Sequence, residues 1–251
     1  MQLKLHMLLF AVLSAVSGCL EISNEITINE DGSGKIIQSV DLGQVLPAAE
    51  KNAGEDVKAK LPDLKTDTVY ALAVFAEGLR DLSDVEKSMI KKGELRVTID
   101  SKAKKFFVAT ALPFAAVEEI EMLQSVSEKI ITEFVNNTGA ELFHRHRDEI
   151  PVLKTIDEFF TTTYADGQIA RTLNSKKYET VANDDFLLQM REAALSGRIM
   201  KSNTVFNLPR PVSKAEGQQA TVSDKKHKVT ISADINDLLD EAQRLEFKIE
   251  Y

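Results

Sequence analysis

Two nearby histidines, His144 and His146, are the strongest candidates for metal chemistry in this sequence. Asp148 and Glu149 follow closely, and zinc takes imidazole nitrogens and carboxylate oxygens as ligands. Three or four ligands must converge on one ion, whereas on a helix residues 144 and 146 would point roughly 200° apart; only a strand would bring them to one side. The only other histidine after residue 18 is His227. We therefore expect surface histidines, no metal site and no cofactor.

A glycine-rich segment, residues 31–35 (DGSGK), has the composition of a phosphate-binding or calcium-binding loop. A P-loop would need glycine at position 29 and serine or threonine at position 36, where this chain has Asn29 and Ile36. An EF-hand counted from Thr27 would need glutamate at its twelfth position, which is Gln38. We therefore interpret the segment as a tight turn.

Hydrolytic chemistry has no recognisable motif in this chain. There is no G-x-S-x-G or H-E-x-x-H string, and the single cysteine lies near the N-terminus. The sequence therefore predicts no catalytic residue, and a hydrolase assembled from residues far apart in the chain is the alternative. Acidic residues outnumber basic residues by 39 to 31, so no basic surplus exists to neutralise phosphates. We expect no nucleic-acid partner.

The first eighteen residues differ in kind from the rest of the chain. They contain one lysine and no acidic residue, and residues 7–16 (MLLFAVLSAV) form an apolar run that small residues follow. A basic start, a short apolar core and a small-residue exit are the parts of a secretory signal. A membrane-spanning helix needs about 20 apolar residues, which this run does not reach. We therefore predict that residues 1–18 are a signal peptide that is removed.

The only cysteine, Cys19, directly follows Val16, Ser17 and Gly18. This string resembles the lipobox of bacterial lipoproteins. The resemblance implies that the Cys19 thiol is diacylated, that the chain is cut before it, and that the lipid then holds the protein on a membrane. Two or more acyl chains bind a bilayer firmly. The next residue, Leu20, is not the acidic residue that some envelopes read as an inner-membrane retention signal, so the outer membrane is favoured.

Strands and helices are both predicted along the mature chain. Asp31-Gly32 between two strand-like runs predicts a hairpin, in which we expect positive φ at Gly32 and Gly34. The runs 94–100 and 105–112 predict a second hairpin. The apolar run 69–75 is compatible with either a buried strand or part of a helix. Residues 140–182 are not ordered by any pattern. The predicted strands are 21–29, 35–42, 94–100, 105–112, 204–208 and 228–233.

Helices are predicted where apolar residues recur every three or four positions. The longest starts near Pro113, which suits a first helical turn, and ends near Gly139. Its apolar stripe consists of Val117, Ile120, Leu123, Val126, Ile130 and Phe134. The other predicted helices are 84–91, 184–195 and 236–242.

The last residues alternate strictly between apolar and charged side chains. Leu245, Phe247, Ile249 and Tyr251 are separated by Glu246, Lys248 and Glu250. An alternation of period two is typical of a strand with one buried face. We therefore expect a sheet strand up to the last residue.

These elements predict an α+β fold, an antiparallel sheet built from hairpins with helices packed on one face. Residues 19–251 would form the lipid-anchored globular region, with 19–135 and 183–251 as parts of one domain. In residues 19–43, 94–123 and 204–251 the turns and strand patterns also resemble the LppM-like lipoprotein domain, a β-rich envelope module without assigned catalysis.

The resemblance implies a non-catalytic binding or structural module of the cell envelope. Its partners would be the membrane, through the N-terminal lipid, and an envelope protein or a lipid ligand. A membrane-anchored hydrolase remains the alternative. A pocket that gathers several acidic residues and His144 or His146 would favour the hydrolase.

Overall fold

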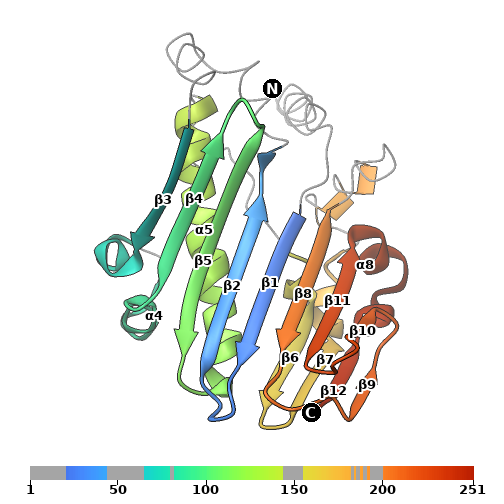
Figure 1. Ribbon diagram of the computed structural model, residues 1–251. Helices are drawn as coiled ribbons and strands as arrows, with labels where there is room; N and C mark the ends of the chain where they lie inside the picture. Colours follow the sequence, from blue (N-terminus) through green and yellow to red (C-terminus); the bar gives the residue numbers. More distant parts are fainter. Residues whose placement is uncertain are drawn as a thin grey trace.

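The structure is a computed structural model that describes residues 21–43, 65–79, 82–143, 155–181, 184, 187–188, 191–192 and 200–251. The predicted signal peptide, Cys19 and the segment from His144 to Glu149 lie outside the described residues. The architecture is α+β, as predicted, with two sheets rather than one (Figure 1). One helix and the smaller sheet lie behind the larger sheet.

The larger sheet has eight strands in the order β10-β11-β8-β1-β2-β5-β4-β3. The hairpins β1–β2 and β4–β5 confirm the two predicted from the sequence. The strand bounds are β1 Glu21–Ile28, β2 Gly34–Asp41, β3 Lys65–Ala71, β4 Glu94–Asp100, β5 Lys105–Phe114, β8 Lys201–Asn207, β10 Ala220–Val222 and β11 Lys228–Asp234.

One pairing departs from the predicted antiparallel sheet. β1 and β8 run parallel, whereas the other neighbouring pairs of this sheet are antiparallel. A hairpin forces its second strand to reverse, but β8 is far from β1 in the sequence and is free of that constraint. The pairing joins the N-terminal strands to the C-terminal strands within one sheet.

The turn between β1 and β2 uses its two glycines differently. Gly32 has a φ of 82°, which confirms the prediction. The same prediction is wrong for Gly34, whose φ is not positive. A Cβ atom at Gly34 would lie 1.9 Å from the carbonyl oxygen of Thr27 and 2.4 Å from Cζ of Phe114. Gly34 is therefore required by close packing rather than by backbone conformation.

The apolar run after residue 68 is neither fully strand nor fully buried. β3 ends at Ala71, and two short 3-10 turns follow, η3 Leu72–Val74 and η4 Ala76–Gly78. Val69 is 53% exposed because β3 lies at the edge of the sheet. The alternative of a buried strand is thus wrong for this segment.

The long helix, α5 Ile120–Phe143, starts later and ends later than predicted. Pro113 lies in β5, opposite Lys35 of β2 and beyond Glu94, where β4 begins. A proline cannot donate a ladder hydrogen bond, so this position at the end of β4 tolerates it. The predicted apolar stripe is buried except for Phe134, which is half-buried.

The smaller sheet has four strands in the order β6-β7-β12-β9. Its first hairpin lies in the segment that no sequence pattern ordered, and a two-residue Asp166-Gly167 loop joins β6 to β7. β9 and β10 lie within the stretch 209–226, which was predicted to be a polar connection. The bounds are β6 Phe160–Ala165, β7 Gln168–Leu173, β9 Lys214–Glu216 and β12 Phe247–Glu250.

The predicted terminal strand is β12, which lies between β7 and β9 and starts at Phe247. Phe247 and Ile249 are buried, and Tyr251 is half-buried. Leu245 is also buried, but it belongs to a 3-10 turn rather than to the strand. The prediction is therefore confirmed for Phe247–Glu250 and wrong for Leu245 and Tyr251, which lie outside the strand.

The remaining helices are short. α4 Asp84–Ile90 begins with a capping box formed by Ser83 and Glu86, as its acidic start suggested. In the segment where 184–195 was predicted to be helical, residues 187–188 and 191–192 are helical. The others are η5 Val117–Glu119, η7 Ile156–Phe159, α6 Ser175–Tyr178, α8 Ile235–Glu241 and η9 Ala242–Leu245.

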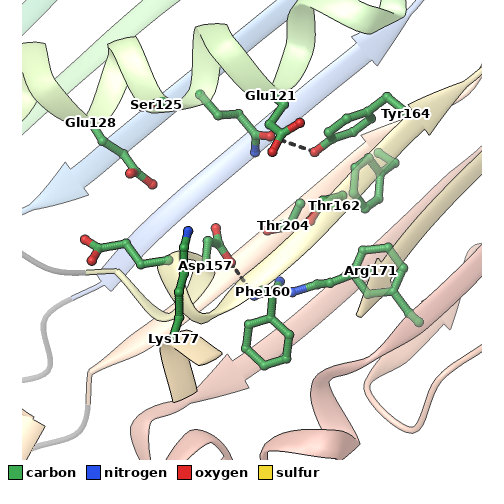
Figure 2. Close-up of a pocket in the computed structure, with 14 residues that line it drawn as sticks. Glu121, Ser125, Glu128, Asp157, Phe160, Thr162, Tyr164, Arg171, Lys177 and Thr204 are labelled. Carbon is green, nitrogen blue, oxygen red and sulfur yellow. Dashed lines mark hydrogen bonds and ion pairs between the residues drawn. The ribbon is translucent and has the colours of Figure 1, made fainter. Parts of the chain in front are cut away.

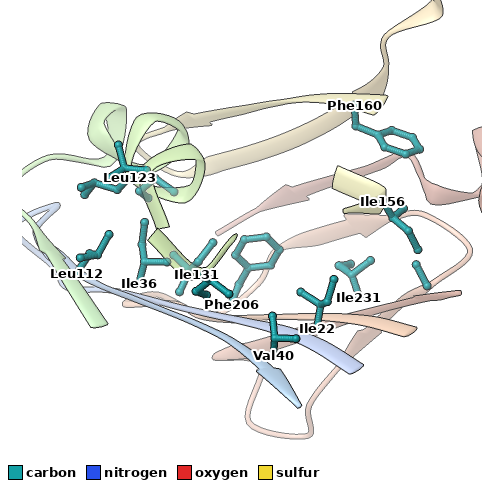
Figure 3. Packing of buried hydrophobic residues seen from close by; sticks show 14 of the residues in the cluster. Ile22, Ile36, Val40, Leu112, Leu123, Ile131, Ile156, Phe160, Phe206 and Ile231 are labelled. Atoms are coloured by element: carbon teal, nitrogen blue, oxygen red, sulfur yellow. The ribbon is translucent and has the colours of Figure 1, made fainter. Parts of the chain in front are cut away.

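The hydrophobic core lies between the larger sheet and the elements behind it (Figure 3). Ile36 and Leu112 of the sheet face Leu123 of α5, while Ile156 and Phe160 close the core on the side of the smaller sheet. Within the described ranges, no helix is both long and apolar enough to cross a membrane.

Candidate functional site

A half-open pocket of about 250 Å³ lies where α5, the smaller sheet and β8 meet (Figure 2). Its lining is mainly polar and includes four carboxylates and two basic side chains. Glu121, Ser125 and Lys177 are exposed at the rim, whereas Arg171 and Phe206 are buried. The remaining lining residues are Gln124, Glu128, Asp157, Glu158, Phe160, Thr162, Tyr164, Thr204 and Phe247.

One face of α5 forms a wall of the pocket. Glu121, Gln124, Ser125 and Glu128 are spaced by three or four residues, so they share one side of the helix. The opposite stripe of α5 is apolar and buried in the core. The same helix therefore anchors the fold and presents polar groups to the pocket.

Arg171 of β7 is the most deeply buried charged residue in the pocket. Its side chain is 5% exposed, and its Nη2 atom lies 2.7 Å from Oδ1 of Asp157. These atoms form an ion pair but are not aligned as a hydrogen bond. The guanidinium also stacks over Phe160 at 4.2 Å and lies 6.0 Å from the ring of Phe247. Among the described residues, Nε of Arg171 has no hydrogen-bond partner.

A row of four polar residues crosses the inner face of the larger sheet beside the pocket. Thr204 of β8 lies opposite Asn24 of β1, Asn24 opposite Gln38 of β2, and Gln38 opposite Thr110 of β5. All four side chains are buried. We call these residues the polar row.

Two residues of the polar row donate hydrogen bonds to carboxylates that line the pocket. Nδ2 of Asn24 donates to Oδ2 of Asp157 at 2.9 Å, and Nε2 of Gln38 donates to Oε1 of Glu128 at 3.5 Å. The hydroxyl of Thr110 is hydrogen-bonded to that of Ser127 on α5. The larger sheet thereby positions carboxylates that come from the other layer.

Glu128 is held in an environment that disfavours its charge. Burial, together with the nearby carboxylate of Asp157, raises the pKa of Glu128 from 4.5 to about 7. The hydroxyl of Thr155 donates to Oε1 of Glu128 at 3.1 Å and opposes this shift. The Glu128 carboxyl is therefore poised between its protonated and ionised forms near neutral pH.

Tyr164 is a hydrogen-bond donor in the pocket. Its hydroxyl donates to Oε1 of Gln124 at 2.7 Å, which links β6 to α5. Burial, with the carboxylate of Asp157, raises the pKa of Tyr164 well above its ordinary value. Tyr164 consequently stays protonated across the physiological range.

The residues singled out from the sequence are not part of this pocket. Residues 31–33 lie in the turn after β1, and Asp31 and Gly32 line a separate cavity with Arg210 and Tyr251. In the parts of the chain that the structure describes, no three His, Cys, Asp or Glu side chains come close enough together to hold a metal ion. His144 and His146 lie outside those parts, so the structure does not place them.

Sequence reasoning missed the pocket, although one signal pointed to it. Asn24 and Gln38 occupy inward positions of strands in which the neighbouring inward residues are isoleucine or valine. A polar residue in the apolar phase of an alternating strand needs a buried partner. Those partners come from segments more than eighty residues away, where no sequence pattern connects them.

Comparisons with known proteins add no family to this description. No protein-family model, no curated protein and no solved structure matches this chain.

Proposed function

We propose that this chain is a lipid-anchored lipoprotein of the bacterial cell envelope, and that its folded region is a non-catalytic module that binds a small polar ligand in the pocket beside α5. The anchor is supported by the string Val16-Ser17-Gly18-Cys19 after a signal-like segment. The binding role rests on one observation: Nε of Arg171, a buried arginine in the pocket, has no hydrogen-bond partner among the residues that the structure describes.

An unpaired buried donor has a thermodynamic meaning. A buried N–H group without an acceptor lowers the stability of the folded protein by roughly 1–3 kcal/mol. A ligand that supplies an acceptor removes this cost. Arg171 is fixed by Asp157 and by stacking on Phe160, so it cannot turn to find a partner. Rigid, preorganised polar groups in a pocket are typical of ligand recognition.

Lipid anchoring is tested by replacing Cys19 in the full-length chain. Cys19→Ser should release the protein from membranes or leave an uncut precursor, because the acyl chains can no longer be attached. Detergent phase partition and mass spectrometry of the N-terminal peptide measure both. A mature protein with an unmodified Cys19 would overturn this part of the proposal.

Ligand binding is tested on the protein that starts at Leu20. A library of small amines, carboxylates and neutral polyols should contain compounds that shift amide signals of β7 and α5 in NMR spectra. Ser125→Trp would fill the mouth of the pocket and abolish these shifts. Met122→Trp is the matched control, because Met122 is 44% exposed on the same helix but does not line the pocket. Shifts that persist in Ser125→Trp would place binding elsewhere.

A hydrolase is the second candidate, and the pair of Glu128 and Asp157 favours it. Two carboxyl groups in different environments, one with a raised pKa and one paired with arginine, are typical of acid–base hydrolysis. The test is hydrolysis of p-nitrophenyl esters, phosphates and glycosides. Turnover that Glu128→Gln abolishes would favour the hydrolase, whereas equal background rates would favour the binding module.

A further inference from the structure

The chemistry of the pocket defines what the ligand must offer to Arg171. Its Nε–H group, which no acceptor in the described part of the chain reaches, requires an acceptor oxygen. Asp157 already neutralises the guanidinium, and three further carboxylates line the pocket. A second anion at this place would meet uncompensated negative charge. The acceptor is therefore a neutral oxygen, such as a hydroxyl or a carbonyl group.

The α5 wall of the pocket favours a positively charged ligand group. Glu121 and Glu128 stand at the two ends of its polar face, and Lys177 comes from α6, across the pocket (Figure 2). With all six charged lining residues ionised, the pocket carries a formal charge of −2, and of −1 when Glu128 is protonated. A positive ligand group beside α5 reduces the repulsion among these carboxylates.

The interior behind the wall also has an excess of acceptors. Oδ1 of Asn24 and Oε1 of Gln38 are buried, and within the described part of the chain no donor reaches them. They adjoin Asp157 and Glu128, which their own amide nitrogens contact. Neither residue lines the pocket, so these oxygen atoms add to the negative electrostatic potential behind the α5 wall without contacting the ligand.

The positive group is organic rather than metallic. The acidic side chains are spread along the pocket, and no three of those described converge as metal ligands must. The volume of about 250 Å³ is below the range of roughly 300–1,000 Å³ typical of pockets for drug-sized molecules. The occupant is therefore about as large as one monosaccharide.

We propose that the pocket binds a small hydroxylated amine, with its ammonium group on the carboxylates of α5 and a neutral oxygen on Nε of Arg171. This inference rests on the proposed binding function and specifies its ligand class. An ammonium group supplies three donors, which matches the oxygen-rich wall.

Three sugars of similar size separate charge from shape. Glucosamine carries an ammonium group, glucose is neutral, and glucuronate is anionic. Calorimetry at pH 6.5, where the amine of glucosamine is protonated, should detect glucosamine binding to the protein starting at Leu20. Removing the charge should weaken binding about tenfold, since a hydrogen bond to a charged group is stronger than a neutral one by about 1.4 kcal/mol. Glucuronate should not bind.

Two matched substitutions locate the ammonium group. Glu121→Gln should weaken glucosamine binding about tenfold by removing a charged acceptor at the exposed rim. Glu118→Gln removes the same charge three residues earlier, outside this pocket, and should leave the affinity unchanged. Equal effects of the two substitutions on affinity would mean that only the net charge of the protein matters. That result would overturn the placement of the ammonium group beside Glu121.

The outcomes distinguish this inference from the proposed function. Equal or tighter binding of glucuronate or glucose, lost in Ser125→Trp, would overturn the amine class and leave the binding function intact. Glucosamine binding that survives Ser125→Trp would overturn both. If none of the three sugars binds, the hydroxylated-amine class is overturned, and the polar library decides the binding function separately.

Discussion

Asn24 and Gln38 show how single residues create the pocket. Each interrupts an otherwise apolar inward phase of its strand, and each holds a carboxylate from another layer. Burying an amide without partners costs free energy, so residues of this kind persist where they are hydrogen-bonded. Both retain an unpaired oxygen among the described residues. The polar row is therefore a place where the fold gives up part of its stability to build a site.

The two glycines of the first hairpin give a test at this scale. Gly34→Ala should lower the free energy of unfolding by about 3 kcal/mol, because its Cβ would overlap the Thr27 carbonyl and force the strands apart. Gly32→Ala should cost about 1 kcal/mol, because only its positive φ is strained and no atom lies within 4 Å of the new Cβ. Urea unfolding measures both. A larger loss at Gly32 would contradict the packing assignment.

Glu128 predicts a dependence of stability on pH. Its pKa is about 7 in the folded protein and 4.5 ordinarily, so between these values the folded state holds a proton that the unfolded chain releases. Stability should therefore fall as pH rises through this window. Glu128→Gln cannot ionise and should be more stable than the wild type at pH 8, by on the order of 2–3 kcal/mol.

The comparison for this substitution is made at two pH values. At pH 4, where Glu128 is protonated in both states, wild type and Glu128→Gln should have similar free energies of unfolding. Urea unfolding at pH 4 and pH 8 measures the difference. Parallel pH profiles of the two proteins would show that Glu128 is not held in a destabilising environment.

Among the elements, the short strand β12 contributes to the smaller sheet, to the pocket and to the core. It is a central strand of the smaller sheet and contributes Phe247 to the pocket and Ile249 to the core. Ile249→Ala should lower the free energy of unfolding by about 2–5 kcal/mol, as is usual for a cavity in a packed core. Lys248→Ala, its half-buried neighbour, should change stability by less than about 0.5 kcal/mol.

Removing the strand is the stronger form of this test. Deletion of residues 245–251 removes three buried apolar side chains, each worth roughly 1.5–3 kcal/mol, against a typical total stability of about 5–15 kcal/mol. The truncated protein starting at Leu20 should therefore be unfolded in a thermal melt. A melting temperature within a few degrees of the full-length domain would show that β12 is dispensable.

On the scale of the whole molecule, the parallel pair β1–β8 joins an N-terminal strand to a strand from the C-terminal part of the chain. Asn24 also reaches Asp157, and Thr155 reaches Glu128, so contacts between distant segments cross the interior in several places. Parts that share one sheet and one core should lose structure together.

Unfolding in urea should therefore be a single transition. Far-UV circular dichroism reports the whole chain, while tyrosine fluorescence reports chiefly residues 155–251, which contain three of the four tyrosines. The two curves should coincide. A separate early transition in fluorescence would mean that the C-terminal part unfolds independently.

The sequence alone determined the local features of this protein. The hairpins β1–β2 and β4–β5, the helices α4 and α8, and the buried stripe of α5 follow from periodicity and turn residues, which act over a few positions. The positive φ of Gly32 follows from the same local steric preference. The signal-like segment and Cys19 remain predictions, since they lie outside the described residues.

The tertiary structure alone decided the sheet order, the β1–β8 pairing and the pocket. Pro113 could occupy β5 only because β4 does not extend alongside it, a fact about a neighbouring strand rather than about the proline's own sequence context. Likewise, Arg171 meets Asp157 across two elements, and Gln38 meets Glu128 across two layers. These contacts depend on which surfaces pack together, and periodicity within one segment carries no information about the partner it will meet.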